Sequence, residues 1–362
     1  MKIYKKVIFA LFLMISMRTF GQVDQDGPYI WHSGKQIINR YILDNVLHVD
    51  SLKEDAPIAV RFVKNADWNF SFKLHKKIVV PPASYLGVNK MFVLSDIEGE
   101  FEAFRALMIG KGVIDEKYNW TFGKGQLVIC GDLFDRGKEV MPYLWLLYKL
   151  EEDAAKKGGF VHVVLGNHDI MNMSGDLRYH SPKYVASAKL MNLEYGKLID
   201  ADTEIGKWLR SKNAIEKIGD KIFLHAGISP KINASDFSLQ AINDQCRSYY
   251  GIATKKLPEE GRLLMGSAGP FWYRGYFGKD RTSPATVDST LAKFACKQIV
   301  VGHTITKENI AGYYNGKVIG VDVNEHSGDR KAVLFINNKT FVVDDKGKQQ
   351  LLEIKDTPVA IE

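Results

Sequence analysis

Short apolar runs alternate with amphipathic stretches along most of this chain. Residues 91–94 form a run typical of a buried strand, and residues 100–109 follow with large apolar side chains at helical spacing. The same strand–helix order recurs at residues 127–130 and 139–157, and again at 161–165 and 183–213. Strands that alternate with helices predict an α/β sheet with helices on its faces.

The later strand-like runs have fewer helices between them. They lie at residues 221–224, 298–301, 318–323, 332–336 and 340–343. This pattern predicts an α/β fold in which a two-sheet, mixed β sandwich is flanked by helices in the order α/β/β/α. We assign the core domain to residues 91–345 and a C-terminal tail to 346–362. Residues 22–90 contain short alternating runs broken by Gly, Asn and Asp, which predict a small N-terminal β-rich extension.

The first residues have the composition of an export signal. Three lysines, at positions 2, 5 and 6, precede an apolar run over residues 7–17, and small residues follow it. A transmembrane anchor is disfavoured because about 20 apolar residues are needed to span a bilayer. We therefore expect residues 1–21 to be a signal peptide and the mature protein, beginning close to Gln22, to be periplasmic or secreted.

Charge and cysteine content exclude several other classes. The formal net charge is +7, and the four basic residues of the predicted signal account for most of it, leaving +3. With no block of like charges, nothing indicates a nucleic-acid or membrane-binding surface. The three cysteines form no CxxC pair, which argues against a zinc ribbon or a disulfide framework. Cys130 is expected to be buried, and a disulfide between Cys246 and Cys296 stays open.

Polar residues gather where the predicted core strands end. Each cluster alone has an ordinary explanation, since Asp-Gly and Asn-containing turns are common and a lone His is usually hydrogen-bonded in a core. Because strand ends in an α/β sheet open onto one crevice, however, two hard divalent cations would explain all the clusters together. The clusters are Ser95-Asp96-Ile97-Glu98-Gly99, Gly131-Asp132-Leu133-Phe134-Asp135-Arg136-Gly137, Gly166-Asn167-His168-Asp169, His225-Ala226-Gly227 and Gly302-His303-Thr304.

The ordered series of these clusters resembles the calcineurin-like metallophosphoesterases. The Asp135-Arg136-Gly137 triplet is similar to the phosphoprotein-phosphatase branch of that family. Residues 171–179, 208–211 and 269–275 resemble the bacterial, Shewanella-like phosphatases. The resemblance covers residues 91–325 and implies a metallophosphoesterase fold for the core domain.

The resemblance also implies two divalent metal ions as cofactors. Such a pair of cations makes water nucleophilic near neutral pH and neutralises charge on the phosphoryl oxygens. The implied ligands are Asp96 and Glu98 for the first cation, Asn167, His225 and His303 for the second, and Asp132 as the bridge between them.

Other residues of the series are implied to act on the substrate. His168 would protonate the leaving oxygen, and Asp135 would accept the other ring proton and fix the tautomer. Arg136, Arg274 and Asn167 would bind the phosphate oxygens. Arg178 is a weaker candidate for the same task.

Glu98 departs from the family, which normally has His at this position. Three carboxylates on one cation make a hard, anionic ligand set, so we expect Mn to be preferred, with Fe, Zn and Mg left open. Alternatively, the first site is weak or empty and the protein only binds phosphoesters.

The leading functional hypothesis is an enzyme, a phosphatase acting on phosphomonoesters of small molecules or proteins. A phosphodiesterase or dinucleoside-polyphosphate hydrolase is the alternative enzyme, and a non-catalytic phosphate-binding relative is the alternative from another class. The motifs do not distinguish the substrates, because these depend on the pocket loops rather than the fold.

Overall fold

The computed structural model describes residues 23–34 and 36–355. Within this part of the chain, no helix is both long and apolar enough to cross a membrane. The predicted signal peptide lies outside the described residues.

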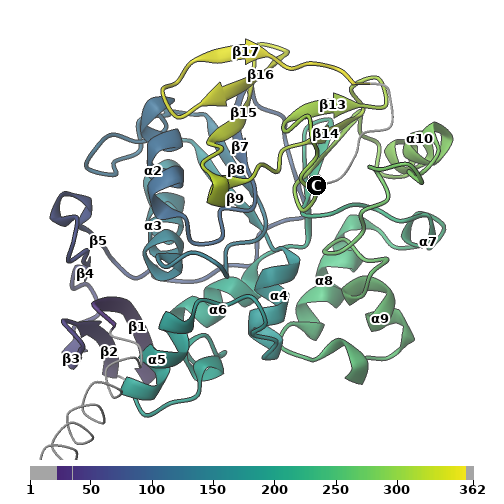
Figure 1. The fold of residues 1–362 in the computed structure, drawn as a ribbon. Helices are drawn as coiled ribbons and strands as arrows, with labels where there is room; N and C mark the ends of the chain where they lie inside the picture. The colour runs from purple at the N-terminus through teal and green to yellow at the C-terminus, as the bar shows by residue number, and fades with distance from the viewer. Residues whose placement is uncertain (1–22, 35, 356–362) are drawn as a thin grey trace, which may run out of the picture.

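Two six-stranded mixed sheets form the centre of the molecule (Figure 1). The first sheet has the order β17-β16-β15-β7-β8-β9, and the second has the order β13-β14-β12-β11-β10-β6. Their strands are β6 (Ser84–Tyr85), β7 (Lys90–Leu94), β8 (Gln126–Cys130), β9 (Phe160–Val164), β10 (Ile215–Ile218), β11 (Lys221–Leu224), β12 (Gln298–Val301), β13 (Ala311–Tyr313), β14 (Val318–Gly320), β15 (Lys331–Ile336), β16 (Lys339–Asp344) and β17 (Gln349–Leu351).

Helices cover the outer faces of both sheets. In Figure 1, α2 and α3 lie on the side of β7–β9, and α7, α8 and α10 lie on the side of the other sheet. The helices are α2 (Phe101–Gly110), α3 (Val140–Ala155), α4 (Asn167–Ser174), α5 (Pro182–Leu190), α6 (Glu204–Ser211), α7 (Pro230–Asn233), α8 (Leu239–Tyr249), α9 (Glu259–Met265) and α10 (Pro284–Lys293), with short 3-10 turns η1 (Ala66–Trp68), η2 (Tyr195–Leu198), η3 (Thr254–Lys256) and η4 (Glu325–Ser327).

The alternation of side chains along the central strands explains this layered arrangement. In β7, Met91 and Val93 belong to the apolar cluster between the sheets, whereas Phe92 and Leu94 belong to the cluster that includes the helices. Side chains in a strand point alternately to opposite faces, so a wholly apolar strand is buried on both sides. The predicted α/β/β/α sandwich is confirmed.

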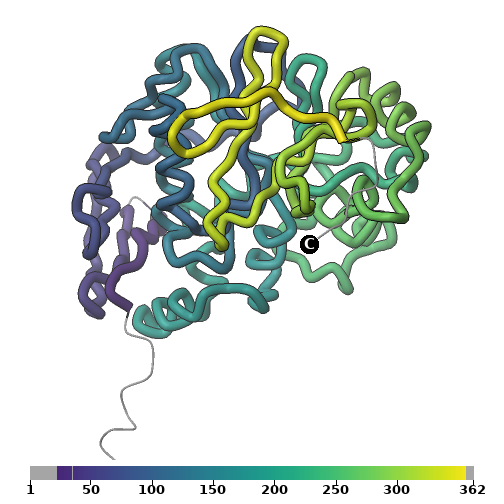
Figure 2. Tube along the Cα trace, turned by 45° about the horizontal axis from the view of Figure 1, so that its top comes forward, coloured from purple at the N-terminus to yellow at the C-terminus, as the bar shows by residue number. Residues whose placement is uncertain are grey.

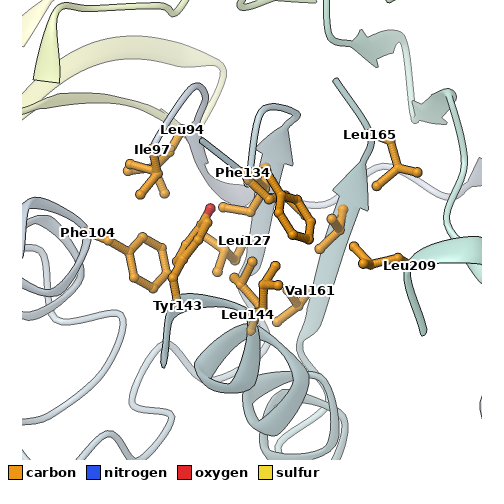
Figure 3. Packing of buried hydrophobic residues seen from close by; sticks show 14 of the residues in the cluster. Leu94, Ile97, Phe104, Leu127, Phe134, Tyr143, Leu144, Val161, Leu165 and Leu209 are labelled. Atoms are coloured by element: carbon orange, nitrogen blue, oxygen red, sulfur yellow. The ribbon is translucent and has the colours of Figure 1, made fainter. Parts of the chain in front are cut away.

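The outer face of the first sheet is sealed by large side chains from α2 and α3. Figure 3 shows Phe104 and Tyr143 beside Leu127 and Leu144, all of them fully buried. Burial of such side chains contributes roughly 1.5–3 kcal/mol each, and this packing fixes the strands whose ends carry the polar clusters.

The N-terminal part forms its own sheets on one side of the molecule, opposite the green helices of residues 230–295 (Figure 2). A three-stranded sheet, β1-β2-β3, and a two-stranded sheet, β4-β5, make up most of it. The strands are β1 (Gln25–Ser33), β2 (Gln36–Leu43), β3 (Val46–Leu52), β4 (Ile58–Val60) and β5 (Phe70–Phe72). Trp145 of α3 donates its indole N–H to the carbonyl of Pro28 at 2.8 Å, which ties the extension to the core.

Some sequence expectations are refined by the structure. β6 belongs to the second central sheet and β17 to the first, although they lie in the expected extension and the expected tail. The helical region expected over residues 183–213 is divided into α5, η2 and α6. All three cysteines are free, so Cys246 and Cys296 are not paired in this structure.

Candidate active site

The polar clusters meet at the carboxyl ends of the central strands. Tight approach of these loops depends on glycines, since a Cβ at Gly166 would collide with the carboxylate of Asp132, and one at Gly302 would collide with Ser95. Several residues of the clusters also have a left-handed backbone, with φ between 44° and 83°, which non-glycine residues adopt only at a cost. These are Asp96, Glu98, Asp132, Asp135, Arg136 and His303.

One half of the crevice is rich in imidazole. His225 Nε2 lies 3.1 Å from Asp132 Oδ2, 2.8 Å from Asn167 Oδ1 and 3.0 Å from His303 Nδ1. The other nitrogen of His225 donates to the carbonyl of Cys130 at 2.9 Å, and the Nε2 of His303 lies 3.2 Å from the carbonyl of Trp272. These backbone contacts leave one nitrogen of each ring free to bind a cation. Asp132, His225 and His303 form a group that could hold a metal ion.

The other half is rich in carboxylates. Glu98, Asp132 and His168 form a second group that could hold a metal ion. The Oε2 atom of Glu98 lies 2.9 Å from an Arg136 nitrogen and 2.6 Å from His326 Nε2. Asp96 lies at the junction of the two halves, because its Oδ2 accepts the backbone N–H of His303 at 3.0 Å.

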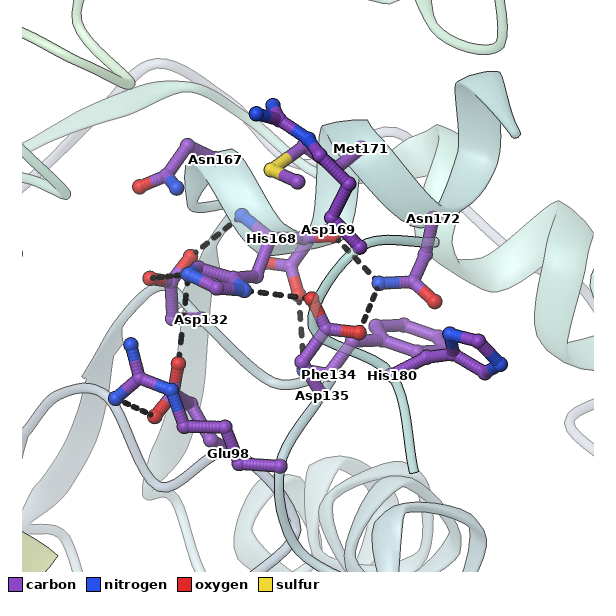
Figure 4. Close-up of polar contacts among 12 residues, drawn as sticks. Glu98, Asp132, Phe134, Asp135, Asn167, His168, Asp169, Met171, Asn172 and His180 are labelled. Atoms are coloured by element: carbon purple, nitrogen blue, oxygen red, sulfur yellow. Dashed lines mark hydrogen bonds and ion pairs between the residues drawn. The ribbon is translucent and has the colours of Figure 1, made fainter. Parts of the chain in front are cut away.

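His168 of this second group is paired with a further carboxylate (Figure 4). His168 Nδ1 is 2.6 Å from Asp135 Oδ2, and the amide of Asn172 donates to Asp135 Oδ1 at 2.7 Å. The Nε2 atom of His168 faces Glu98 Oε1 at 3.5 Å and Asp132 Oδ2 at 3.9 Å. Although burial lowers it, the carboxylates of Asp132 and Asp135 raise the pKa of His168 to about 9. A raised pKa favours the protonated ring, which is the form that a general acid requires.

The charges in the crevice fit the binding of divalent cations. Burial, together with the nearby Asp132 carboxylate, raises the pKa of Asp96 to about 7. Burial and the charges of Asp96 and Glu98 raise the pKa of Asp322 well above its usual range. The Oδ1 atom of Asp322 finds no hydrogen-bond partner among the described residues. Buried carboxylates that outnumber their protein partners are stabilised by bound cations. The oxygen and imidazole donors present here suit Mn, Fe, Zn or Mg.

The two predicted phosphate-binding arginines border the same crevice. A cavity of about 180 Å³ is lined by Arg136 and Arg274 together with Asp96, Glu98 and Asp132. Arg274 donates to the carbonyl of His303 at 2.5 Å, which holds it at the imidazole half.

Arg178 lies elsewhere. It pairs with Asp176 at 2.8 Å on the surface and does not line this cavity. The structure thus brings together every residue predicted for the site except this weaker candidate.

Comparison with known proteins identifies the family. A model of the calcineurin-like phosphoesterase family matches residues 90–307. The chain belongs to this family. It is also similar to Shewanella-like protein phosphatase 2 of Arabidopsis thaliana, with 25% identity over 66% of this chain and 72% of the relative. The symmetrical bis(5'-nucleosyl)-tetraphosphatase of Xanthomonas oryzae is 25% identical over 53% of this chain and 54% of that relative.

A solved structure is similar over nearly the whole described chain. The cold-active protein-tyrosine phosphatase of a psychrophilic Shewanella species has 36% sequence identity and a TM-score of 0.84, covering 91% of this chain and 99% of that one. The predicted family and its Shewanella-like branch are confirmed. This calcineurin-like phosphoesterase is a metal-dependent hydrolase of phosphoesters, and its homologues support a phosphatase.

This phosphoesterase has a sixth polar cluster that was not predicted from the sequence. Asp322, Asn324 and His326 line the same cavity and follow β14. The strand was expected to extend to residue 323 but ends at Gly320, so Asp322 was counted as part of a strand. The signal was present, since polar residues follow an apolar run here as they do in the other five clusters.

Asn172 was also missed. Its amide bridges Asp135 and the backbone carbonyl of His168, and its Oδ1 accepts the hydroxyl of Tyr195 at 2.7 Å. It lies four residues after His168, and that helical spacing, which brings both residues to one face of α4, was the available signal.

Proposed function

We propose that this phosphoesterase is a phosphatase that cleaves phosphomonoesters, with phosphorylated protein side chains as its substrate class. The observation that carries the proposal is the His168–Asp135 pair, whose free Nε2 faces the carboxylates of Glu98 and Asp132. Similarity to the Shewanella protein-tyrosine phosphatase supports a phosphoprotein substrate.

The proposed metal ligands follow the two halves of the crevice. Asp96 and Glu98 would hold the first cation, Asn167, His225 and His303 would hold the second, and Asp132 would be shared by both sites. Two cations held there would supply Lewis-acid activation of water and neutralisation of charge on the phosphoryl group. His225 and His303 are oriented for this task by their contacts with the carbonyls of Cys130 and Trp272.

The remaining roles concern the substrate. His168 donates the proton from Nε2 to the leaving oxygen, and Asp135 stabilises the ring through Nδ1. Arg136 and Arg274 bind the non-bridging oxygens from two sides of the cavity, and Asn167 contributes its amide. Arg136 is 46% exposed and paired with Glu98, so it exchanges that partner for phosphate when the substrate enters.

Glu98 supports Mn as the preferred cation. A third carboxylate on the first cation gives a harder donor set than the imidazole found at this position in the family. Replacing Glu98 by His should improve the binding of Fe and Zn relative to Mn. Bound metal measured by mass spectrometry, after loading each variant with an equimolar mixture, tests the expectation; an unchanged ratio would contradict it.

Export of the protein is a separate proposal. The basic, apolar and small-residue order of residues 1–21 supports a cleaved signal peptide and a periplasmic or secreted mature protein. Sequencing the N-terminus of protein recovered from its native cells should give a start close to Gln22. An intact Met1 on a cytosolic product would overturn the proposal.

A dinucleoside-polyphosphate hydrolase is the alternative, because the symmetrical tetraphosphatases share part of the sequence. The test is a substrate panel on the mature chain, with phosphotyrosyl and phosphoseryl peptides, an aryl phosphodiester and a dinucleoside tetraphosphate. We expect metal-dependent release of phosphate from the peptides to exceed the other rates. Preference for the dinucleotide would select the alternative, and metal binding without any turnover would indicate a non-catalytic relative.

A further inference from the structure

A histidine from the far end of the domain contacts the loop that carries the first metal ligands. His326 lies in η4, which follows β14, and its Nε2 is 2.6 Å from Glu98 Oε2. Its Nδ1 is 3.0 Å from Glu100 Oε1. A single ring therefore bridges two carboxylates of the loop after β7, 226 and 228 residues earlier in the chain.

The two oxygens of Glu98 are placed differently by these contacts. Oε2 is shared by Arg136 at 2.9 Å and His326 at 2.6 Å. Oε1 lies 3.5 Å from the Nε2 of His168, which is too long for a strong hydrogen bond. Glu98 is 2% exposed, and it lines the cavity between the two arginines. Oε2 is thus held by two protein donors, whereas Oε1 is left available to a cation.

We propose that His326 is a positioning residue of the first metal site, which holds Glu98 Oε2 so that Oε1 alone is presented to the cation. The proposal rests on the metal roles of the proposed function. Ligands of metals are commonly oriented by a hydrogen bond on their far side, and loss of such a partner typically lowers metal affinity 10- to 100-fold. The pair of Glu98 and His326 then replaces the histidine that the family normally has at position 98.

Arg136 does not make His326 redundant. Its side chain is nearly half exposed at the cavity where phosphate is proposed to bind, so an anion competes with Glu98 for it. His326 has a more fixed position than Arg136. Glu100 holds its second nitrogen, and the side chain of Asn324, at the start of η4, accepts the backbone N–H of Ser327. When a phosphate engages Arg136, His326 remains to hold the carboxylate.

The test measures metal binding rather than turnover. Metal-free full-length mature protein is titrated with Mn²⁺, and free Mn²⁺ is followed by electron paramagnetic resonance. His326→Ala should weaken one of two Mn²⁺ equivalents 10- to 100-fold and leave the other unchanged. His326→Gln, which retains one N–H donor, should recover part of the loss. His48→Ala, on exposed β3, is the matched control and should bind as the parent does.

Two further results decide the proposal. In a Glu98→Gln background, His326→Ala should have little additional effect, because the carboxylate that it positions is gone. Parent-like binding by both His326 variants overturns the proposal, and so does equal weakening of both equivalents, which would indicate a general defect. Since no substrate is present, failure of the proposed phosphatase activity leaves this readout intact, and the two failures can be told apart.

Discussion

Two regions of this protein place histidines beside carboxylates, and they are organised in opposite ways. One is the crevice at the strand ends. The other, here called the extension network, joins the N-terminal extension to α3 and α6. In that network, Glu204 lies 2.6 Å from His32 Nε2 and accepts the hydroxyl of Tyr148 at 2.5 Å. It continues through His75, whose Nε2 lies 2.8 Å from the Tyr148 carbonyl, to Glu151, which is paired with Lys212 at 2.5 Å.

The two regions differ in whether every buried polar atom has a hydrogen-bond partner. Within the described chain, no residue of the extension network has a buried polar atom without a hydrogen-bond partner. Asp322 and Glu325, near the crevice, each have one such atom. A buried network in which every group is paired contributes to a unique fold, while unpaired carboxylates are costly unless something else neutralises them. Burial of charged groups therefore does not by itself indicate catalysis, but an excess of one charge does indicate a missing ligand.

The largest expected effect comes from Asp132→Asn. Asp132 is the residue that both proposed metal groups share, so the change should remove bound metal and reduce activity to the background of the metal-free protein. Metal content by mass spectrometry and turnover of an aryl phosphate check this. Retention of both metals would show that the crevice does not depend on this carboxylate.

His168→Ala should have the next largest effect, a loss of roughly 10²- to 10⁴-fold in kcat. Metal content should stay at the parent level, because the proposed role of the ring is proton donation. The same two measurements, applied to both variants, separate the roles. A His168→Ala protein that has lost its metal would make His168 a ligand instead.

Glu204→Gln tests the extension network, where we expect an effect on stability and none on catalysis. Glu204 is 4% exposed and accepts from two side chains, so we expect the free energy of unfolding to fall by about 1–3 kcal/mol. Metal content and kcat of the folded protein should not change. Urea denaturation at fixed metal concentration measures the loss. A fall in kcat without a fall in stability would break the distinction between the two regions.

The smallest effect concerns pH. Burial lowers the pKa of His75, so the unfolded chain binds this proton more readily than the folded one. The stability that neutral His75 contributes is therefore fully present above its unfolded pKa, about 6.5, and is lost as the pH falls through that value. The parent should lose more unfolding free energy between pH 7.5 and 5.5 than His75→Gln does. Parallel pH profiles would contradict this assignment.

The strands and five of the site clusters could be predicted because the information is local. An apolar run followed by Asp, Asn or His is visible within ten residues, as at Asp96 and His303. His326 could not be placed beside Glu98 in the same way, because their contact depends on β15 pairing with β7 and returning the end of the chain to the first loop. The extension network joins residues from four distant segments, and no spacing in the sequence relates them.

The left-handed backbone of the site residues has a consequence for how the protein responds to loss of metal. Left-handed geometry costs roughly 1–2 kcal/mol for each non-glycine residue, and six such residues together approach the whole stability of an ordinary domain, about 5–15 kcal/mol. Packing of the two sheets offsets part of this cost. Bound cations then add stability according to their concentration and affinity. Chelation should consequently do more than stop turnover: it should turn the strand-end loops into the first places where a protease can cut.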